Sequence, residues 1–164
     1  MAVALNKLGL RPGDRFADIG CGTAKVSIAA SLIVKEVVAI DDRPEAIDTA
    51  KAMITASGRN NIHLVEGTAT DYLQDCEELD AAFIGGSRDL EKVLSLLSKK
   101  VHRTIVVDAV MLGTLNTAVG TMQRLGIFKE AVQINIFRSH PISNGLMFKP
   151  IDPVFIIVGE VGTC

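Results

Sequence analysis

The chain has 164 residues, of which 48% are hydrophobic, and its 17 basic and 19 acidic side chains give a formal net charge of −2. This length suits one domain with a single core, so we expect one domain over residues 1–164. The charge balance lacks the basic surplus typical of nucleic-acid-binding proteins, so no nucleic-acid partner is expected.

Two further properties narrow the class of protein. No apolar run is long enough to span a bilayer, and residues 1–13 lack the apolar region of a signal peptide, which predicts a cytoplasmic protein without a membrane partner. The three cysteines, Cys21, Cys76 and Cys164, have no spacing typical of zinc ligands or of a disulfide framework. We therefore expect no metal site.

The first predicted strand leads into a glycine-rich loop. Residues 2–10 are expected to end a helix, 15–19 form a short apolar strand, and a new helix begins at about residue 24. Gly20 and Gly22 lie between them, where glycine lets the backbone turn tightly and leaves room for a ligand. A strand-turn-helix can also carry two glycines without binding anything, so the loop alone does not establish a nucleotide site.

The residues around the loop distinguish two cofactors. A dinucleotide fingerprint requires a third glycine where this chain has Lys25. Asp18, two residues before the first glycine, instead suits a cationic adenosyl ligand, because a carboxylate offsets the charge of a sulfonium. We interpret the loop as a binding site for S-adenosylmethionine, which leaves S-adenosylhomocysteine as the product.

A second carboxylate follows at the end of the next predicted strand. Residues 37–40 are a buried strand ending in Asp41, which lies 19 residues after Gly22. In a β-α-β unit this spacing brings a carboxylate to the ribose hydroxyls. Asp42 is free to cap the helix that Pro44 opens, over residues 44–57.

The third and fourth predicted strands, 62–66 and 81–84, are each followed by small residues. Thr68 and Ala69 follow Gly67 at the edge where open α/β sheets bind ligands. Gly85 and Gly86 would let a substrate approach the backbone. The same turn lacks the Asn/Asp-Pro-Pro-aromatic sequence of amino-group methyltransferases, so that chemistry is excluded.

In the last third of the chain the alternation of strands and helices ends with two strands that have no helix between them. We expect a helix over 90–100, a basic cluster from Lys99 to Arg103 that forms a solvated helix end, a strand over 104–107 and a helix over about 114–125. Strands 132–137 and 154–158 are joined by 138–153, which is too short for a crossover helix, so they should pair antiparallel. The prediction is the Rossmann-like α/β fold of class I S-adenosylmethionine-dependent methyltransferases, with a seven-stranded, mostly parallel sheet and a C-terminal antiparallel hairpin.

Two sets of site residues follow from this arrangement. The predicted cofactor positions are Asp18, Gly20, Cys21, Gly22, Thr23, Asp41, Asp42, Thr68, Ala69 and Gly85. The substrate-side candidates, none with an assigned catalytic role, are Gly85, Gly86, Ser87, Arg88, Arg138, His140 and Met147. Cys21 is expected to be a small packing residue, and arginine is suited to binding carboxylates.

Five segments carry a resemblance to a known family: residues 18–23 (DIGCGT), 38–41 leading into 43–47, 85–87 (GGS), 144–148 (NGLMF) and 152–154 (DPV). With these segments, nearly the whole chain resembles the decarboxylating precorrin methyltransferases of cobalamin biosynthesis. This resemblance implies a tetrapyrrole substrate, methyl transfer to ring carbon C(15), loss of carbon dioxide from an acetate side chain, and a homotetramer.

The chain departs from the family pattern at several positions. This chain has Ala24 and Arg88 at positions where the family usually has glycine. It has Thr68 in place of the family's acid, Gly113 in place of the family's glutamate and Asp152 in place of the family's asparagine. It also begins later than the family. Two alternatives therefore stay open: a methyltransferase of this fold acting on another small molecule or RNA, and a non-catalytic nucleotide-binding module.

Overall fold

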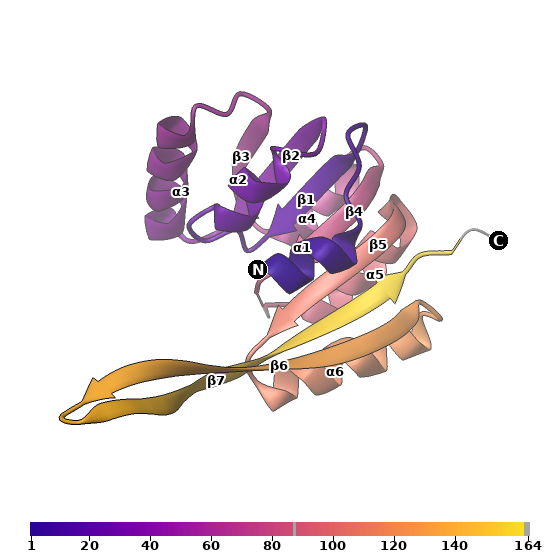
Figure 1. The fold of residues 1–164 in the computed structure, drawn as a ribbon. Coiled ribbons are helices and arrows are strands. Elements are labelled where there is room, and N and C mark those ends of the chain that lie inside the picture. Colours follow the sequence, from indigo (N-terminus) through magenta and orange to yellow (C-terminus); the bar gives the residue numbers. More distant parts are fainter. Residues whose placement is uncertain (87, 163–164) are drawn as a thin grey trace.

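One seven-stranded sheet organises the chain, in the strand order β3-β2-β1-β4-β5-β7-β6 (Figure 1). The structure is a computed structural model, and it describes residues 1–86 and 88–162. The strands are β1 (Arg15–Ile19), β2 (Glu36–Asp41), β3 (Ile62–Glu66), β4 (Leu79–Ile84), β5 (Val101–Ala109), β6 (Phe128–Ile142) and β7 (Gly145–Glu160). The helices are α1 (Ala2–Leu8), α2 (Lys25–Ala30), α3 (Pro44–Ser57), α4 (Ala69–Asp75), α5 (Leu90–Lys100) and α6 (Leu112–Arg124).

The sheet grows outward from β1 in two directions. β1 pairs in parallel with β2 on one side and with β4 on the other, so that Ala17 lies beside both Val38 and Ala82. The chain runs from β1 through β2 to β3, then returns to the centre and continues through β4 to β5. At such a switch in strand order the loops at the carboxyl ends diverge and leave a crevice, which is where open α/β sheets bind ligands.

Helices cover both faces of the sheet and form two apolar layers. Side chains of α4, α5 and α6, among them Leu73, Leu94 and Met122, pack with strand residues in one cluster. On the other face α1 and α2 pack against strand residues such as Phe16 in a second cluster. Burial from both sides explains why β1, β2 and β4 are mostly apolar, whereas the edge strand β3 has no fully buried residue.

Several elements have the bounds that the sequence predicts. β1, α3, β3 and α5 cover residues 15–19, 44–57, 62–66 and 90–100. Their ends carry strong local signals: Pro44 stands in the first turn of α3, and Gly58 ends that helix in a left-handed conformation with φ +66°. The predicted α/β fold with a closing antiparallel hairpin is confirmed.

Helix α4 was not predicted. It is a short helix with mixed polar composition, and of its residues only Thr70 and Leu73 are buried, so its apolar periodicity is weak. Thr68 starts it by accepting a hydrogen bond from the Asp71 N–H. None of the helices in the described ranges is long and apolar enough to cross a membrane.

The prediction of a solvated basic cluster from Lys99 to Arg103, at the end of α5, is wrong for two of its members. β5 begins at Val101, so Arg103 lies in a strand and its guanidinium donates to both carboxylate oxygens of the buried Asp14, at 3.1 and 2.6 Å. Lys100 donates to the carbonyl oxygen of Cys76 at 2.7 Å. These groups connect elements of the fold, because a charge beside a buried carboxylate or carbonyl satisfies it.

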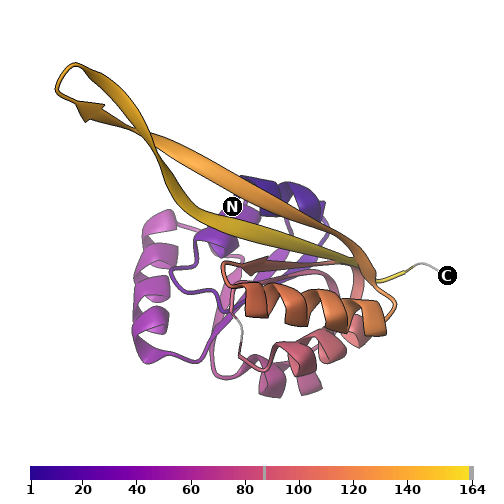
Figure 2. The same ribbon diagram turned by 90° about the horizontal axis from the view of Figure 1, so that it is seen from below.

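The closing hairpin is longer than predicted. Residues 138–153 were expected to be a connection, but all of them except the turn residues 143–144 belong to β6 and β7, which pair antiparallel out to Ile142 opposite Gly145. Figures 1 and 2 show this arm projecting well beyond the body of the molecule. Side chains from Ile136 to Asp152 are exposed throughout, so no alternation of buried and exposed positions signals a strand there.

Candidate functional site

The glycine loop after β1 is held against the end of β2. The N–H groups of Gly20 and Cys21 both donate to the carbonyl oxygen of Ile40, at 2.8 and 3.0 Å. Gly20 and Gly22 have φ values of +71° and +55°, a region that glycine occupies without strain. Ala24 has φ +57° at the start of α2, a conformation that explains why glycine is usual at this position.

Asp18 is a buried carboxylate under this loop. It is 1% exposed, its Oδ2 accepts a hydrogen bond from the Ser27 hydroxyl, and its Oδ1 is buried without a partner among the described residues. Burial raises the pKa of Asp18 to about 6. Asp18 does not line the cavity described below, so it can act on a ligand there through its charge but not by contact.

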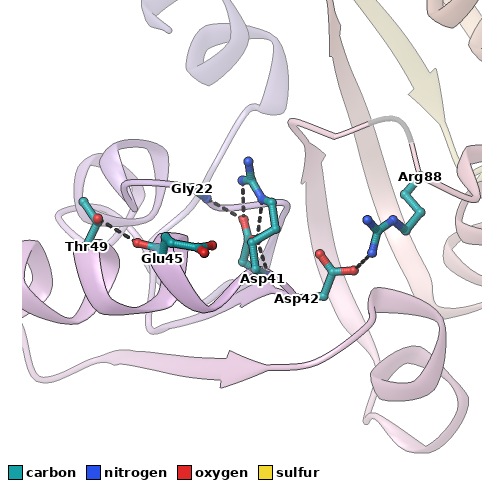
Figure 3. A network of polar contacts seen from close by, with 7 residues as sticks. Gly22, Asp41, Asp42, Glu45, Thr49 and Arg88 are labelled. Carbon is teal, nitrogen blue, oxygen red and sulfur yellow. Dashed lines mark hydrogen bonds and ion pairs between the residues drawn. The ribbon is translucent and has the colours of Figure 1, made fainter.

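Asp41 connects the second strand to the glycine loop (Figure 3). The Gly22 N–H donates to its Oδ2 at 2.9 Å, and the Arg43 side chain donates from Nε to Oδ1 at 3.0 Å and from Nη2 to Oδ2 at 2.9 Å. Burial acts to raise the pKa of Asp41, but the hydrogen bonds from Arg43 and Gly22 prevail and lower it below its ordinary value. Asp41 is therefore an ionised carboxylate held in one orientation.

The expectation that Asp42 caps α3 is wrong. The N-cap residue of α3 is Arg43, and no side chain makes a capping hydrogen bond there. Asp42 instead forms an ion pair with Arg88, which comes from the loop before α5 (Figure 3). Opposite charges draw these two loops together across the carboxyl edge of the sheet.

These loops surround a cavity of about 540 Å³. Its walls are Ile19, Gly20, Ile40, Asp41, Asp42, Arg43, Gly67, Thr68, Ala69, Thr70, Ile84, Gly85, Gly86, Arg88, Asp89 and Val93. The volume lies within the range of about 300–1,000 Å³ typical of small-molecule sites. Among the predicted cofactor positions, this cavity includes Gly20, Asp41, Asp42, Thr68, Ala69 and Gly85.

The other predicted cofactor positions lie outside the cavity wall. Cys21 is buried beside Ala24, and burial raises the pKa of its thiol to about 12, so it is an uncharged packing residue as predicted. The Gly22 N–H orients Asp41 by donating a hydrogen bond to its Oδ2, and Thr23 is exposed. The loop thus shapes the cavity mainly through its backbone.

The glycines after β4 pack against the first loop. A Cβ atom built on Gly20 would lie 3.1 Å from the backbone nitrogen of Gly86, and one on Gly85 would lie 3.2 Å from the carbonyl oxygen of Gly20. Glycine is therefore required for the two turns to touch, in addition to exposing backbone to the cavity. Ser87 lies outside the described residues.

Thr68 and Ala69 form the wall at the start of α4. The Thr68 hydroxyl lies 3.1 Å from that of Thr70 and accepts from the Asp71 N–H at 3.2 Å. Because this hydroxyl already has partners, it is a weaker anchor for a ligand amine than the acid that the family has here.

The hairpin candidates do not reach the cavity of their own chain. Arg138, His140 and Met147 are exposed on the projecting arm, with His140 opposite Met147 in the pairing of β6 and β7. The substrate-side candidates that line the cavity are Gly85, Gly86 and Arg88.

Sequence reasoning missed three charged or polar residues of the cavity: Arg43, Thr70 and Asp89. Arg43 stands two residues after Asp41, at the start of a helix, and its position was the only signal that could have indicated a role. Among the described residues no group of histidine, cysteine, aspartate or glutamate side chains could hold a metal ion.

Comparison with known proteins identifies the family. Residues 1–159 match the precorrin methyltransferase domain family. A protein of Methanosarcina acetivorans named probable cobalt-precorrin-6B C(15)-methyltransferase (decarboxylating) is 42% identical, over 98% of this chain and 90% of its own length.

Solved structures agree with that family in fold. A precorrin-8w decarboxylase of Methanobacterium thermoautotrophicum has a TM-score of 0.92 at 30% identity, over 99% of this chain and 88% of its own. A precorrin-6Y C5,15-methyltransferase of Geobacter metallireducens has a TM-score of 0.90 at 31% identity, over 97% of this chain and 87% of its own. A SAM-dependent O-methyltransferase of Thermotoga maritima shares the fold at 16% identity, with a TM-score of 0.76 over 99% of this chain and 64% of its own. The chain has the class I methyltransferase fold and belongs to the precorrin methyltransferase family.

Proposed function

We propose that this protein is an S-adenosylmethionine-dependent methyltransferase that methylates C(15) of cobalt-precorrin-6B and decarboxylates it. The observation that carries the proposal is the cavity formed by the carboxyl ends of β1, β2, β3 and β4, in a chain of this family. The reaction itself is that in the name of the Methanosarcina acetivorans relative.

The residues of the cavity fit this cofactor. Ionised Asp41 suits a pair of ribose hydroxyls, and Ile40, Ala69 and Val93 offer apolar surface to an adenine ring. The unpartnered, buried Oδ1 of Asp18 supplies negative charge beneath the loop. When bound, the cofactor supplies a methyl group already activated by a sulfonium, so the protein's task is to align and desolvate the reactants.

The acceptor would approach from the side of the cavity where Arg88 stands. Its guanidinium pairs with Asp42 through Nη1, and a substrate carboxylate could take the place of that partner because arginine is well suited to binding carboxylates. In decarboxylation the bond to the carboxyl carbon breaks, carbon dioxide leaves, the electron pair passes into the conjugated tetrapyrrole, and a proton from solvent then completes the remaining side chain as a methyl group. No acid-base pair is needed from the protein for that step.

The projecting arm supports assembly into a tetramer. Its exposed apolar side chains include Ile136, Phe137, Leu146 and Phe148, each more than half exposed. A two-stranded ribbon alone is only marginally stable in water, so contact with further copies of the chain would stabilise it. Such contact is also the way in which Arg138 and His140 could reach substrate, at the cavity of a neighbouring copy. Light scattering should give four times the chain mass, and a monomer would contradict the assembly.

Mass spectrometry of a cobalt-precorrin incubated with the protein and S-adenosylmethionine tests the reaction. A gain of one methyl with loss of carbon dioxide is expected. An unchanged substrate with bound cofactor would favour a methyltransferase with another acceptor, whereas binding of neither S-adenosylmethionine nor its product would favour a non-catalytic module. The cytoplasmic location and the absence of a nucleic-acid partner stay predictions.

The variant Asp41→Ala tests the cofactor site by calorimetry. Loss of two charged hydrogen bonds should weaken binding of S-adenosylhomocysteine by about 1–3 kcal/mol. Asp48→Ala removes an exposed carboxylate from α3, the helix that follows Asp41, and should leave binding unchanged. If the Asp41 variant and the wild type bound S-adenosylhomocysteine with equal affinity, Asp41 would not be a cofactor-binding residue.

A further inference from the structure

The carboxylate of Asp41 has every acceptor position filled by the protein itself. Oδ1 accepts from the backbone N–H of Arg43 at 3.1 Å and from its Nε at 3.0 Å. Oδ2 accepts from the Gly22 N–H and from Nη2 of Arg43, both at 2.9 Å. Two oxygens provide about four lone-pair positions, so no position is left for a ligand while this arrangement persists.

The four donors differ in how readily they can leave. The two backbone N–H groups are fixed by the loop and by the start of α3. The guanidinium is at the end of a side chain that is 60% exposed, while the Asp41 side chain is 2% exposed. Arg43 can therefore move into solvent without disturbing the core, whereas Asp41 cannot move.

The guanidinium also matches a ribose diol in its pattern of donors. It contributes one N–H to each oxygen of Asp41, and two adjacent hydroxyls on a ribose would contribute one O–H to each oxygen. Both sets of donors need the same two lone pairs. Only one can occupy Asp41 at a time.

We propose that Arg43 is an internal competitor of the cofactor, occupying the ribose-binding positions of Asp41 and leaving them when the cofactor binds. This inference rests on the proposed function. It makes Arg43 a residue that sets the affinity and selectivity of the site: a ligand without a diol cannot replace both hydrogen bonds that Arg43 gives up. Asp42, whose charge also raises the pKa of Arg43, lies close by as a second carboxylate for the displaced guanidinium.

Calorimetric titration with S-adenosylhomocysteine tests the competition in four proteins: wild type, Arg43→Gln, Arg43→Lys and Arg59→Gln. Removing the guanidinium should tighten binding about fivefold, the scale of a partly exposed ion pair. Arg43→Lys keeps the positive charge but cannot form two parallel hydrogen bonds, so this variant's affinity for S-adenosylhomocysteine should lie between those of the wild type and Arg43→Gln. Arg59 is exposed in the loop after α3, and its variant should bind like the wild type.

Adenosine and 2′,3′-dideoxyadenosine separate competition from a general effect of charge, with binding followed by NMR titration. The Arg43→Gln variant should bind adenosine more tightly than the wild type does, with no gain for the dideoxy compound. Equal gains for both compounds, or a variant that binds S-adenosylhomocysteine no better than the wild type, would overturn the inference while leaving the cofactor assignment intact. Absence of S-adenosylhomocysteine binding in all four proteins would instead refute the proposed function on which the inference rests.

Discussion

The variant Asp18→Asn should make the protein more stable at neutral pH. Burial raises the pKa of Asp18 from 3.8 to about 6 in the folded chain. At about 1.4 kcal/mol per pKa unit, keeping Asp18 ionised in the fold costs about 3 kcal/mol. Asparagine has nearly the same shape, keeps an oxygen to accept from Ser27, and carries no charge at any pH.

The pH dependence has a definite sign. Between pH 3.8 and about 6 the folded chain keeps a proton on Asp18 that the unfolded chain releases, so stability falls as the pH rises through this window. The advantage of the Asp18→Asn variant should therefore grow from about 1 kcal/mol at pH 4.5 to about 3 kcal/mol at pH 7.5. Any fixed cost of the new amide group is the same at both pH values and cancels in the comparison.

Urea denaturation of wild type and variant at pH 4.5 and 7.5 measures this change. Asp75→Asn provides a matched control, because it makes the same substitution at an exposed carboxylate. The reasoning is refuted if the advantage of the Asp18 variant does not increase with pH. A confirmed increase would mean that the chain retains a destabilising charge beneath its cofactor loop, as functional sites commonly do.

Two further substitutions test how the fold supports the site. Gly20→Ala should lower the unfolding free energy by about 2–3 kcal/mol, because it combines a left-handed backbone with a Cβ that would contact the neighbouring turn. Gly13→Ala, where a Cβ meets open space, should have little effect in the same thermal and urea measurements. Arg103→Ala leaves Asp14 buried without its cation and should cost about 3 kcal/mol. His102→Ala, its exposed neighbour, should change stability by less than about 0.5 kcal/mol, and equal losses for both would contradict a structural role for the ion pair.

The elements that the sequence predicts well are those with strong local signals. The bounds of α3 follow from Pro44 and Gly58, and β1 is a short, mostly apolar run that ends at Ile19, just before Gly20. Helix α4 and the outer half of the hairpin lack such signals: α4 is short and polar, and the arm buries neither of its faces in one chain. Their structure depends on partners that local sequence does not reveal.

The site shows the same division. The placement of Asp41 at a ligand-binding edge follows from strand spacing, because parallel strands end at a common edge. Side-chain pairing does not follow from spacing. Asp42 selects Arg88, 46 residues away, rather than capping the adjacent helix, and Arg43 turns back onto Asp41. Such choices depend on rotamers and distances that exist only once the loops are folded.

The strand order also determines when the site can form during synthesis. β1 needs β4 as its neighbour, so that Phe16 lies beside Ala81, and the centre of the sheet cannot close until the ribosome has released residues up to Ile84. Until then the edge of β1 that later pairs with β4 stays open, in addition to the outer edge of β3. The hairpin of β6 and β7, in contrast, joins residues next to each other in the chain, so its pairing requires only a short loop to close. A ribosome stalled before β4 would thus hold a chain with its glycine loop made but without a cavity, exposed to capture by chaperones through the edge of β1.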